Sequence, residues 1–184
     1  MNILRRLCRS YLRWRHTRGY GVHSPLAYRI VCDVLQEHDR YYAYPEIDAA
    51  TRSSERGCGR CMRRARMLHR LASRFPALRA ETGENLHPAM KLAVGEAKYS
   101  GSHPQASSLI AAQGDEARSV IGRLPEMCTE ARNGRVILAL FSLTQVEIDE
   151  LWEGMDCGVL LAGRDAAIAV LDAGVSKVRY TVRL

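Results

Sequence analysis

Two cysteines at metal-ligand spacing, Cys58 and Cys61, are the first candidates for chemistry in this sequence. A Cys-x-x-Cys pair supplies two of the roughly four ligands that a structural zinc ion needs, or the two thiols of a redox centre. No second Cys-x-x-Cys and no His-x-x-x-His pattern completes such a site, and only His69 could join the pair. We therefore predict no metal site. We expect the six cysteines to be free thiols, as is usual in a reducing compartment.

No motif in the sequence identifies a catalytic base or nucleophile. The Gly-x-Ser-x-Gly, His-Glu-x-x-His and P-loop patterns are absent, so the catalytic residues stay unknown. His23 is the most interesting single histidine, because it precedes a helix start in which Ser24 is the N-cap and Pro25 the first helical residue. Two interpretations stay open for His23: packing or hydrogen bonding to the backbone, or contact with a ligand at the edge of the sheet.

Arginine-rich segments offer a different chemistry, the binding of phosphate groups. The net charge is +7, with 17 Lys and Arg against 6 Asp and Glu in residues 1–80 and 10 against 14 in residues 81–184. A basic surface with aromatic rings beside it is typical of nucleic-acid binding, and Tyr11, Trp14 and Tyr20 accompany the first arginines. Because only three residues are lysines, the arginine content can also reflect genome composition. The arginines concerned are Arg5, Arg6, Arg9, Arg13, Arg60, Arg63, Arg64, Arg66, Arg70 and Arg74.

The elements that would position these residues differ between the two parts of the chain. Hydrophobic spacing predicts helices in the first part and alternating helices and strands in the second. We predict an N-terminal helical segment over residues 1–76, packed on a core formed by residues 77–184, with one structural domain overall. The predicted helices of the first part cover residues 3–15, 25–38, a stretch that begins at 45, and 61–75.

The second part has the order expected of a three-layer α/β domain. Residues 135–141 are apolar throughout, which favours a strand that is buried on both faces. Short turns join the last three strands, and such short turns require antiparallel neighbours. We predict strands over 77–82, 98–100, 135–141, 158–162, 166–171 and 177–184, and helices over 88–97, 104–112, 115–131 and 144–155.

Three segments resemble a family of bacterial class I S-adenosylmethionine-dependent methyltransferases. Gly21-Val-His-Ser-Pro25, followed by a helix and then by Tyr41-Tyr-Ala-Tyr-Pro-Glu-Ile47, is similar to the opening of that family. Val178-Arg-Tyr-Thr-Val-Arg-Leu184 is similar to the family's last strand. The resemblance implies a Rossmann-like, methyltransferase-type three-layer sandwich of reduced size, with an N-terminal helical layer and C-terminal antiparallel strands.

The same resemblance implies S-adenosylmethionine as the cofactor and indicates residues that would line it. The family has an acidic residue after its first strand and a glycine two positions on, matched here by Glu81 and Gly83. The glycine lets the backbone approach the cofactor. The end of the second strand falls at Ser100-Gly101. The predicted cofactor-binding residues are therefore Glu81, Gly83, Ser100, Gly101 and His23.

Three positions depart from the family pattern where the cofactor or substrate would lie. His87 stands where the family has a glycine, and its imidazole would crowd the cofactor. Ser100 replaces a carboxylate that accepts hydrogen bonds from ribose hydroxyls. A later acidic pair is replaced by Leu140-Phe141, which cannot bind a metal. These departures predict an eroded cofactor site with weak or no activity.

Two functions therefore remain open at the level of sequence. The first is a methyltransferase-like protein, which we expect to be inactive rather than active as an S-adenosylmethionine-dependent enzyme. The alternative is a non-catalytic binding or assembly module that uses its basic helices to bind nucleic acid or an acidic protein. No apolar run is long enough to span a membrane and no signal peptide is apparent, so we expect a cytoplasmic protein without a membrane partner. The sequence leaves a homodimer open.

Overall fold

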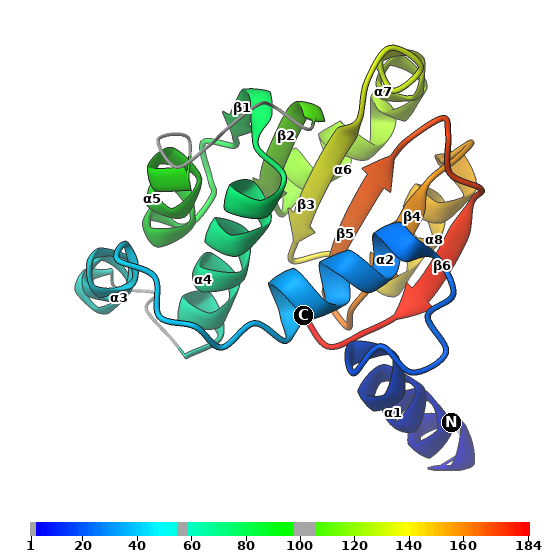
Figure 1. Ribbon diagram of the computed structural model, residues 1–184, viewed down its shortest axis with the longest axis horizontal. Helices are drawn as coiled ribbons and strands as arrows, with labels where there is room; N and C mark the ends of the chain where they lie inside the picture. The colour runs from blue at the N-terminus through cyan, green and yellow to red at the C-terminus, as the bar shows by residue number, and fades with distance from the viewer. Residues whose placement is uncertain (1–2, 55–58, 98–105) are drawn as a thin grey trace.

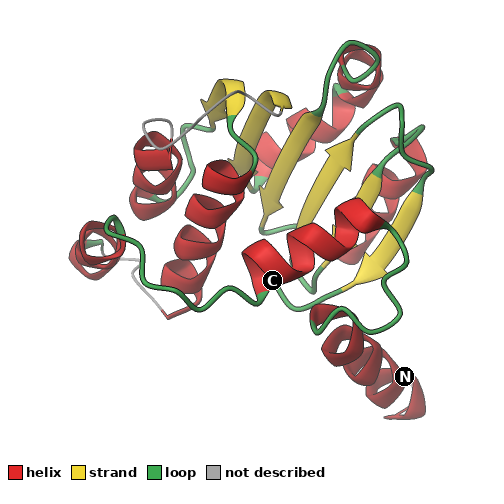
Figure 2. Ribbon diagram, in the orientation of Figure 1, coloured by secondary structure: helices red, strands yellow, loops and turns green. Residues whose placement is uncertain are grey.

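A mixed sheet of six strands lies between two layers of helices (Figures 1 and 2). The computed structural model describes residues 3–54, 59–97 and 106–184. Helices α2, α4 and α5 cover the face toward the viewer in Figure 1, and α6, α7 and α8 cover the opposite face. The elements are α1 (Ile3–Thr17), α2 (Pro25–Ile30), the π-helix η1 (Val31–Leu35), α3 (Tyr44–Ser53), α4 (Gly59–Arg74), β1 (Ala77–Thr82), α5 (Pro88–Ala97), β2 (Ala106–Gln113), α6 (Asp115–Gly122), α7 (Leu124–Glu130), β3 (Val136–Phe141), α8 (Gln145–Gly154), β4 (Val159–Ala162), β5 (Ala166–Leu171) and β6 (Val178–Thr181).

The strands are ordered β1-β2-β3-β5-β4-β6 across the sheet. Strands β1, β2 and β3 are parallel, and β5 is antiparallel to both of its neighbours, β3 and β4. The predicted antiparallel pairing is confirmed for β4 and β5 but is wrong for the last strand, because β6 pairs with β4 in parallel. Both edges of β5 are already occupied. The chain therefore passes β5 and adds β6 at the free edge of β4.

The predicted helix over residues 104–112 is also wrong, because the described part of this range belongs to strand β2. Residues Ser108 to Ala112 are all buried between β1 and β3, so neither the two-residue period of a half-exposed strand nor a helical period is visible in the sequence. The predicted helix over 115–131 is two helices, α6 and α7, with Pro125 in the first turn of α7. The predicted strand over 98–100 lies outside the described residues.

Strand β3 is the centre of the hydrophobic core. All six of its residues are buried, as the apolar run predicts. Ile137, Ala139 and Phe141 belong to a hydrophobic cluster with α2, η1, α4 and α5, whereas Val136 and Leu138 belong to a second cluster with α6, α7 and α8. The two helical layers therefore meet the same strand from opposite sides, which is the expected coarse α/β architecture.

The N-terminal segment is joined to the last strand by the hydroxyl of Tyr180. The backbone N–H groups of His23 and Ser24 both donate to this oxygen, each at 3.1 Å. The Ser24 hydroxyl accepts from the N–H of Ala27 at 3.4 Å, which confirms Ser24 as the N-cap of α2. Two of the segments that resemble the methyltransferase family, 21–25 and 178–184, therefore contact each other directly.

Helix α1 lies apart from the two layers, beside the end of β6 (Figure 1). The His16 Nδ1 atom is 3.2 Å from the carbonyl oxygen of Thr181, and the hydroxyl of Thr17 accepts from the N–H of Arg183 at 2.8 Å. None of the helices in the described ranges is both long enough and apolar enough to cross a membrane.

Replacing Tyr180 by phenylalanine tests the contact between the N-terminal segment and β6. Tyr180→Phe removes the acceptor of two backbone N–H groups, so we expect the free energy of unfolding to fall by about 1–2 kcal/mol. Urea unfolding measures the change. The control is Tyr42→Phe, because Tyr42 is fully exposed, and an unchanged midpoint for Tyr180→Phe would show that the hydroxyl is dispensable.

Candidate functional site

The loop after β1, where the sequence predicts the polar end of a cofactor, is closed by a side chain of the protein itself. Glu116 lies in the first turn of α6. The backbone N–H of Asn85 donates to both oxygens of its carboxylate, and each N···O distance is 3.1 Å. The Asn85 side-chain amide donates to Glu116 Oε1 at 3.3 Å. A Cβ on Gly83 would overlap Glu116 Oε2. Gly83 thus permits a close approach, as predicted, but the group that approaches is Glu116.

The acidic residue predicted for this loop is engaged elsewhere. Glu81 pairs with Arg79 at 2.5 Å on strand β1, which forms one edge of the sheet. In dinucleotide-binding folds the ligand lies where the order of the parallel strands reverses direction. Within the described residues, β1, β2 and β3 follow one another in one direction from the edge, so the parallel strands have no such reversal.

His87 is buried at the start of α5, directly after the same loop. Its Nδ1 accepts from the N–H of Ala89 at 3.2 Å, and its Nε2 is buried with no hydrogen-bond partner among the described residues. Burial lowers the pKa of His87 below its ordinary value of 6.5 because the charged imidazole would be desolvated. The neutral ring therefore fills space at the helix start, where the family pattern has a glycine.

The other predicted positions do not join this loop. Ser100 and Gly101 lie outside the described residues. The side chain of His23 is exposed, and its backbone N–H bonds to Tyr180, so the structure gives His23 a backbone role. Leu140 and Phe141 are buried in opposite hydrophobic clusters, and the carboxylate at that end of β3, Asp165, is already paired with Arg64.

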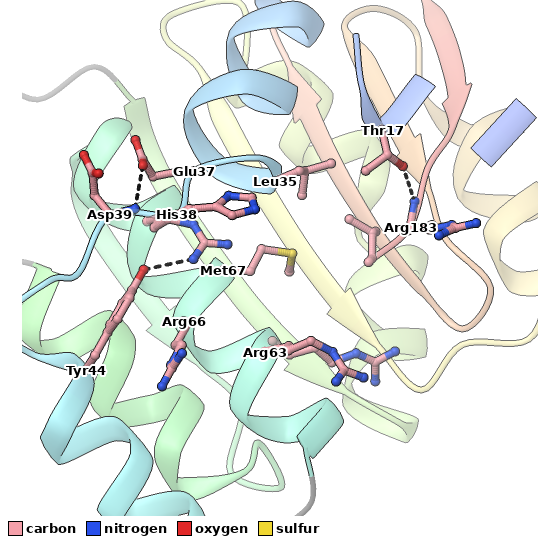
Figure 3. Close-up of a pocket in the computed structure, with 13 residues that line it drawn as sticks. Thr17, Leu35, Glu37, His38, Asp39, Tyr44, Arg63, Arg66, Met67 and Arg183 are labelled. Carbon is pink, nitrogen blue, oxygen red and sulfur yellow. Dashed lines mark hydrogen bonds between the residues drawn. The ribbon is translucent and has the colours of Figure 1, made fainter. Parts of the chain in front are cut away.

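A groove of about 630 Å³ lies instead between α4, the connection from η1 to α3, and the C-terminal segment. This volume is in the range of roughly 300–1,000 Å³ that small-molecule pockets have. Figure 3 shows Leu35, His38 and Met67 around its centre, with Arg63 at one border and Thr17 at another. The lining also includes Tyr44, Arg64, Arg70, Arg183 and Leu184.

Arg64 positions α4 over the carboxyl end of β3. Its guanidinium carbon lies 5.4 Å from the centroid of the Phe141 ring, and its Nη2 donates to Asp165 Oδ1 at 2.6 Å. Arg60 pairs with the other oxygen of Asp165 at 3.2 Å. The Arg64 side chain is 7% exposed, and its Nε has no hydrogen-bond partner among the described residues. Because Arg64 also lines the groove, the groove lies beside the carboxyl end of β3.

Three arginines of the groove have no carboxylate partner in the described parts of the chain. Arg70 donates from Nε to the carbonyl of Val34 at 2.6 Å and from Nη1 to the Tyr44 hydroxyl at 2.9 Å, and both acceptors are neutral. Arg63 and Arg183 are exposed and form no ion pair within the described residues. Their positive charge is therefore not compensated by a neighbouring side chain.

Two other charged side chains of the groove, Arg66 and Glu37, each form an ion pair. Arg66 donates to both oxygens of Asp48, with Nε to Oδ1 at 2.9 Å. Glu37 pairs with Arg74 at 3.4 Å, and the N–H of Asp39, which donates at 2.8 Å, lowers the pKa of the Glu37 carboxyl. Asp39 is the exposed acidic side chain of the groove, so positive charge prevails there.

An exposed aromatic pair lies on α1. Trp14 is about one helical turn and Tyr11 nearly two turns before the groove residue Thr17. Tyr11 and Trp14 are stacked with ring centroids 6.0 Å apart, and the guanidinium carbon of Arg18 lies 4.9 Å from the Trp14 ring centroid. Tyr20, the third predicted aromatic residue, is also exposed. Nothing is described for the side chains of residues 3–7 and 9, which include three of the predicted arginines.

Sequence reasoning identified the arginines of α4 but missed their partners in the groove. His38, Met67 and Arg183 come from three separate segments, and no spacing rule connects them. The contact of Glu116 was not predicted, because its partner Asn85 lies 31 residues earlier in the chain. Only the excess of positive charge in residues 1–80 pointed toward this surface.

Metal chemistry has no candidate in the part of the chain that the structure describes. No three His, Cys, Asp or Glu side chains there are grouped so that they could hold a metal ion. Cys61 lies near the start of α4, whereas Cys58 falls outside the described residues.

No protein-family model, curated protein or solved structure matches this chain. A function for the site must therefore be inferred from its own residues.

A double-mutant cycle tests the contact between Gly83 and Glu116. Gly83→Ala forces the carboxylate away from Asn85, so we expect the free energy of unfolding to fall by about 1–2 kcal/mol. In the Glu116→Ala background the same change should cost much less, since the group that it displaces is gone. Gly122→Ala is the control, because a Cβ there meets nothing. Equal costs in both backgrounds would contradict the contact.

Acid titration tests the buried neutral His87. Because the folded-state pKa lies below 6.5, the unfolded chain binds more protons, and stability should fall as the pH drops through 6.5 toward the folded-state pKa. Chemical unfolding between pH 7.5 and 5 should show a smaller loss for His87→Asn than for the wild-type protein. Leu78→Ala, at an exposed position without a titratable group, should keep the wild-type slope. If both variants keep it, His87 is not the group responsible.

Proposed function

We propose that this protein is a non-catalytic binding module of methyltransferase-like architecture that binds an anionic ligand in the groove beside α4. The observation that carries the proposal is the set of three arginines, Arg63, Arg70 and Arg183, that have no carboxylate partner within the described residues. Both partners expected from the basic helices, nucleic acid and an acidic protein, are anions.

The geometry of Arg70 supports this role. Its two hydrogen bonds to neutral oxygens hold the guanidinium in place without cancelling its charge. A guanidinium that is already positioned loses little conformational freedom when it binds an anion. Hydrogen bonds between charged groups contribute about 1.5–3 kcal/mol each, more than bonds between neutral groups. Met67 and Leu35 would contact any apolar part of the ligand.

Methyl transfer from S-adenosylmethionine is the less favoured function. The loop that would receive the polar end of the cofactor already binds the Glu116 carboxylate. Strand β1 lies at an edge of the described sheet, and Leu140 and Phe141 replace the later acidic pair. These features support loss of the cofactor site while the α/β scaffold is kept.

Calorimetry with sodium tripolyphosphate at low salt tests the proposed anion site. We expect binding to the wild-type protein and about fivefold to tenfold weaker binding for Arg63→Gln, a change of about 1–1.4 kcal/mol, because the exposed Arg63 contributes less than a desolvated charged contact. The matched control is Arg132→Gln, because Arg132 is exposed and lies between α7 and β3, away from the groove. Absence of binding at low salt, or equal weakening by both variants, would refute an anion site at this groove.

S-adenosylmethionine is titrated in the same experiment to test the non-catalytic part of the proposal. We expect no heat at millimolar concentration from the wild-type protein. A binding signal from the wild-type protein would contradict the proposal, and a further increase in Glu116→Ala would place the cofactor in the loop after β1.

A further inference from the structure

We propose that the anionic ligand is a single-stranded nucleic acid, with one nucleotide in the groove and a neighbouring base stacked on Tyr11 and Trp14. This inference rests on the proposed anion site and specifies its ligand. Stacking platforms combined with a basic groove are the means by which proteins bind single strands without reading their sequence.

Two arginines of α4 lie on one side of the helix, before and after the buried side chain of Met67. Arg63, Met67 and Arg70 are spaced at i, i+4 and i+7, so they follow one face of the helix. Seven residues correspond to about 10 Å along the axis, at about 1.5 Å per residue. Two guanidinium groups therefore lie on either side of Met67, which is buried in the core, and the partly buried Leu35 adds apolar surface to the groove. A nucleotide, with a charged backbone and an apolar base, matches this combination. An acidic side chain of a protein would use the guanidinium groups but not the exposed rings of Tyr11 and Trp14.

The last turn of α1 is fixed at the groove, and the aromatic pair lies on the two turns that precede it. Tyr11 and Trp14 are 58% and 37% exposed, so their rings are accessible to a base. Thr17, which follows Trp14 by one turn, lines the groove. Its carbonyl accepts from Gln36 Nε2 at 2.6 Å and its hydroxyl from the N–H of Arg183 at 2.8 Å. These contacts fix the end of α1 against two sides of the groove.

A buried donor at the groove is consistent with an additional acceptor from a ligand. Arg64 lines the groove, its side chain is 93% buried, and its Nε has no hydrogen-bond partner among the described residues. Phosphate oxygens accept hydrogen bonds from guanidinium groups in this manner. The excess of Lys and Arg in residues 1–80 adds long-range attraction to a polyanion.

The test compares a labelled oligouridine 12-mer with an abasic 12-mer of equal charge, by fluorescence anisotropy at low salt. We expect the oligouridine to bind more tightly than the abasic strand, and Trp14→Ala to weaken oligouridine binding about tenfold while leaving abasic binding unchanged. Arg63→Gln should weaken both strands. Leu78→Ala is the control for exposed apolar surface, because Leu78 lies on β1, and circular dichroism verifies that each variant is folded.

A second readout reports on the stacking itself. The chain has two tryptophans, so Trp152→Phe leaves Trp14 as the only indole fluorophore. Oligouridine should quench its emission, and the abasic strand should not. Equal binding of the two strands, or tighter binding of a 12-residue polyglutamate, would overturn the nucleic-acid inference. Tripolyphosphate binding without oligonucleotide binding would refute this inference and keep the anion site, whereas absence of both would refute the two proposals together.

Discussion

The buried guanidinium of Arg64 is the interaction on which the geometry of the groove depends. It stacks on Phe141 at the end of the central strand and bonds to Asp165 in the turn before β5. A buried charge is costly unless it is paired, so the side chain can be accommodated here only because the carboxylate is present. Once α4 is fixed at this point, the helical repeat determines where its other arginines lie. Arg70, nearly two turns on, reaches the Tyr44 hydroxyl and the end of η1.

The residues that resemble the methyltransferase family contribute to architecture. The hydroxyl of Tyr180 joins the 21–25 segment to β6 through two backbone hydrogen bonds. Tyr41 and Tyr44 both pack edge-on against His69 of α4, with ring centroids 5.4 and 6.0 Å away. The side chains of these segments that the structure describes therefore contact other parts of the scaffold.

The loop after β1 and the groove beside α4 differ in whether their hydrogen-bond donors already have a carboxylate partner. At the loop after β1, the donors of Asn85 are satisfied by Glu116, and the Gly83 backbone lies against that carboxylate. At the groove, Arg70 is held by neutral oxygens, and Arg63 and Arg183 face solvent. An electrostatic site that is already neutralised gains little from another anion, whereas an uncompensated one gains more. This contrast is why the proposed function is assigned to the groove.

The sequence by itself determined the elements whose signals are local. The Ser24-Pro25 helix start, the helix predicted over 144–155 and the apolar run of β3 all have the predicted structure, because short-range sterics and hydrogen bonding decide them. The sequence also located the basic helix α4. The prediction from sequence was wrong at β2, because burial on both faces removes the periodicity of a strand. It was also wrong for the pairing of β6, because the neighbour of this strand depends on which edge of the sheet is free.

The candidate site was decided only by the tertiary structure. His38, Arg70 and Arg183 approach one another because packing on β3 brings three distant segments together. Glu116 replaced the predicted cofactor contact because α6 begins beside the loop after β1. Such contacts depend on the summed geometry of the sheet and its layers, which residue spacing along one segment does not encode.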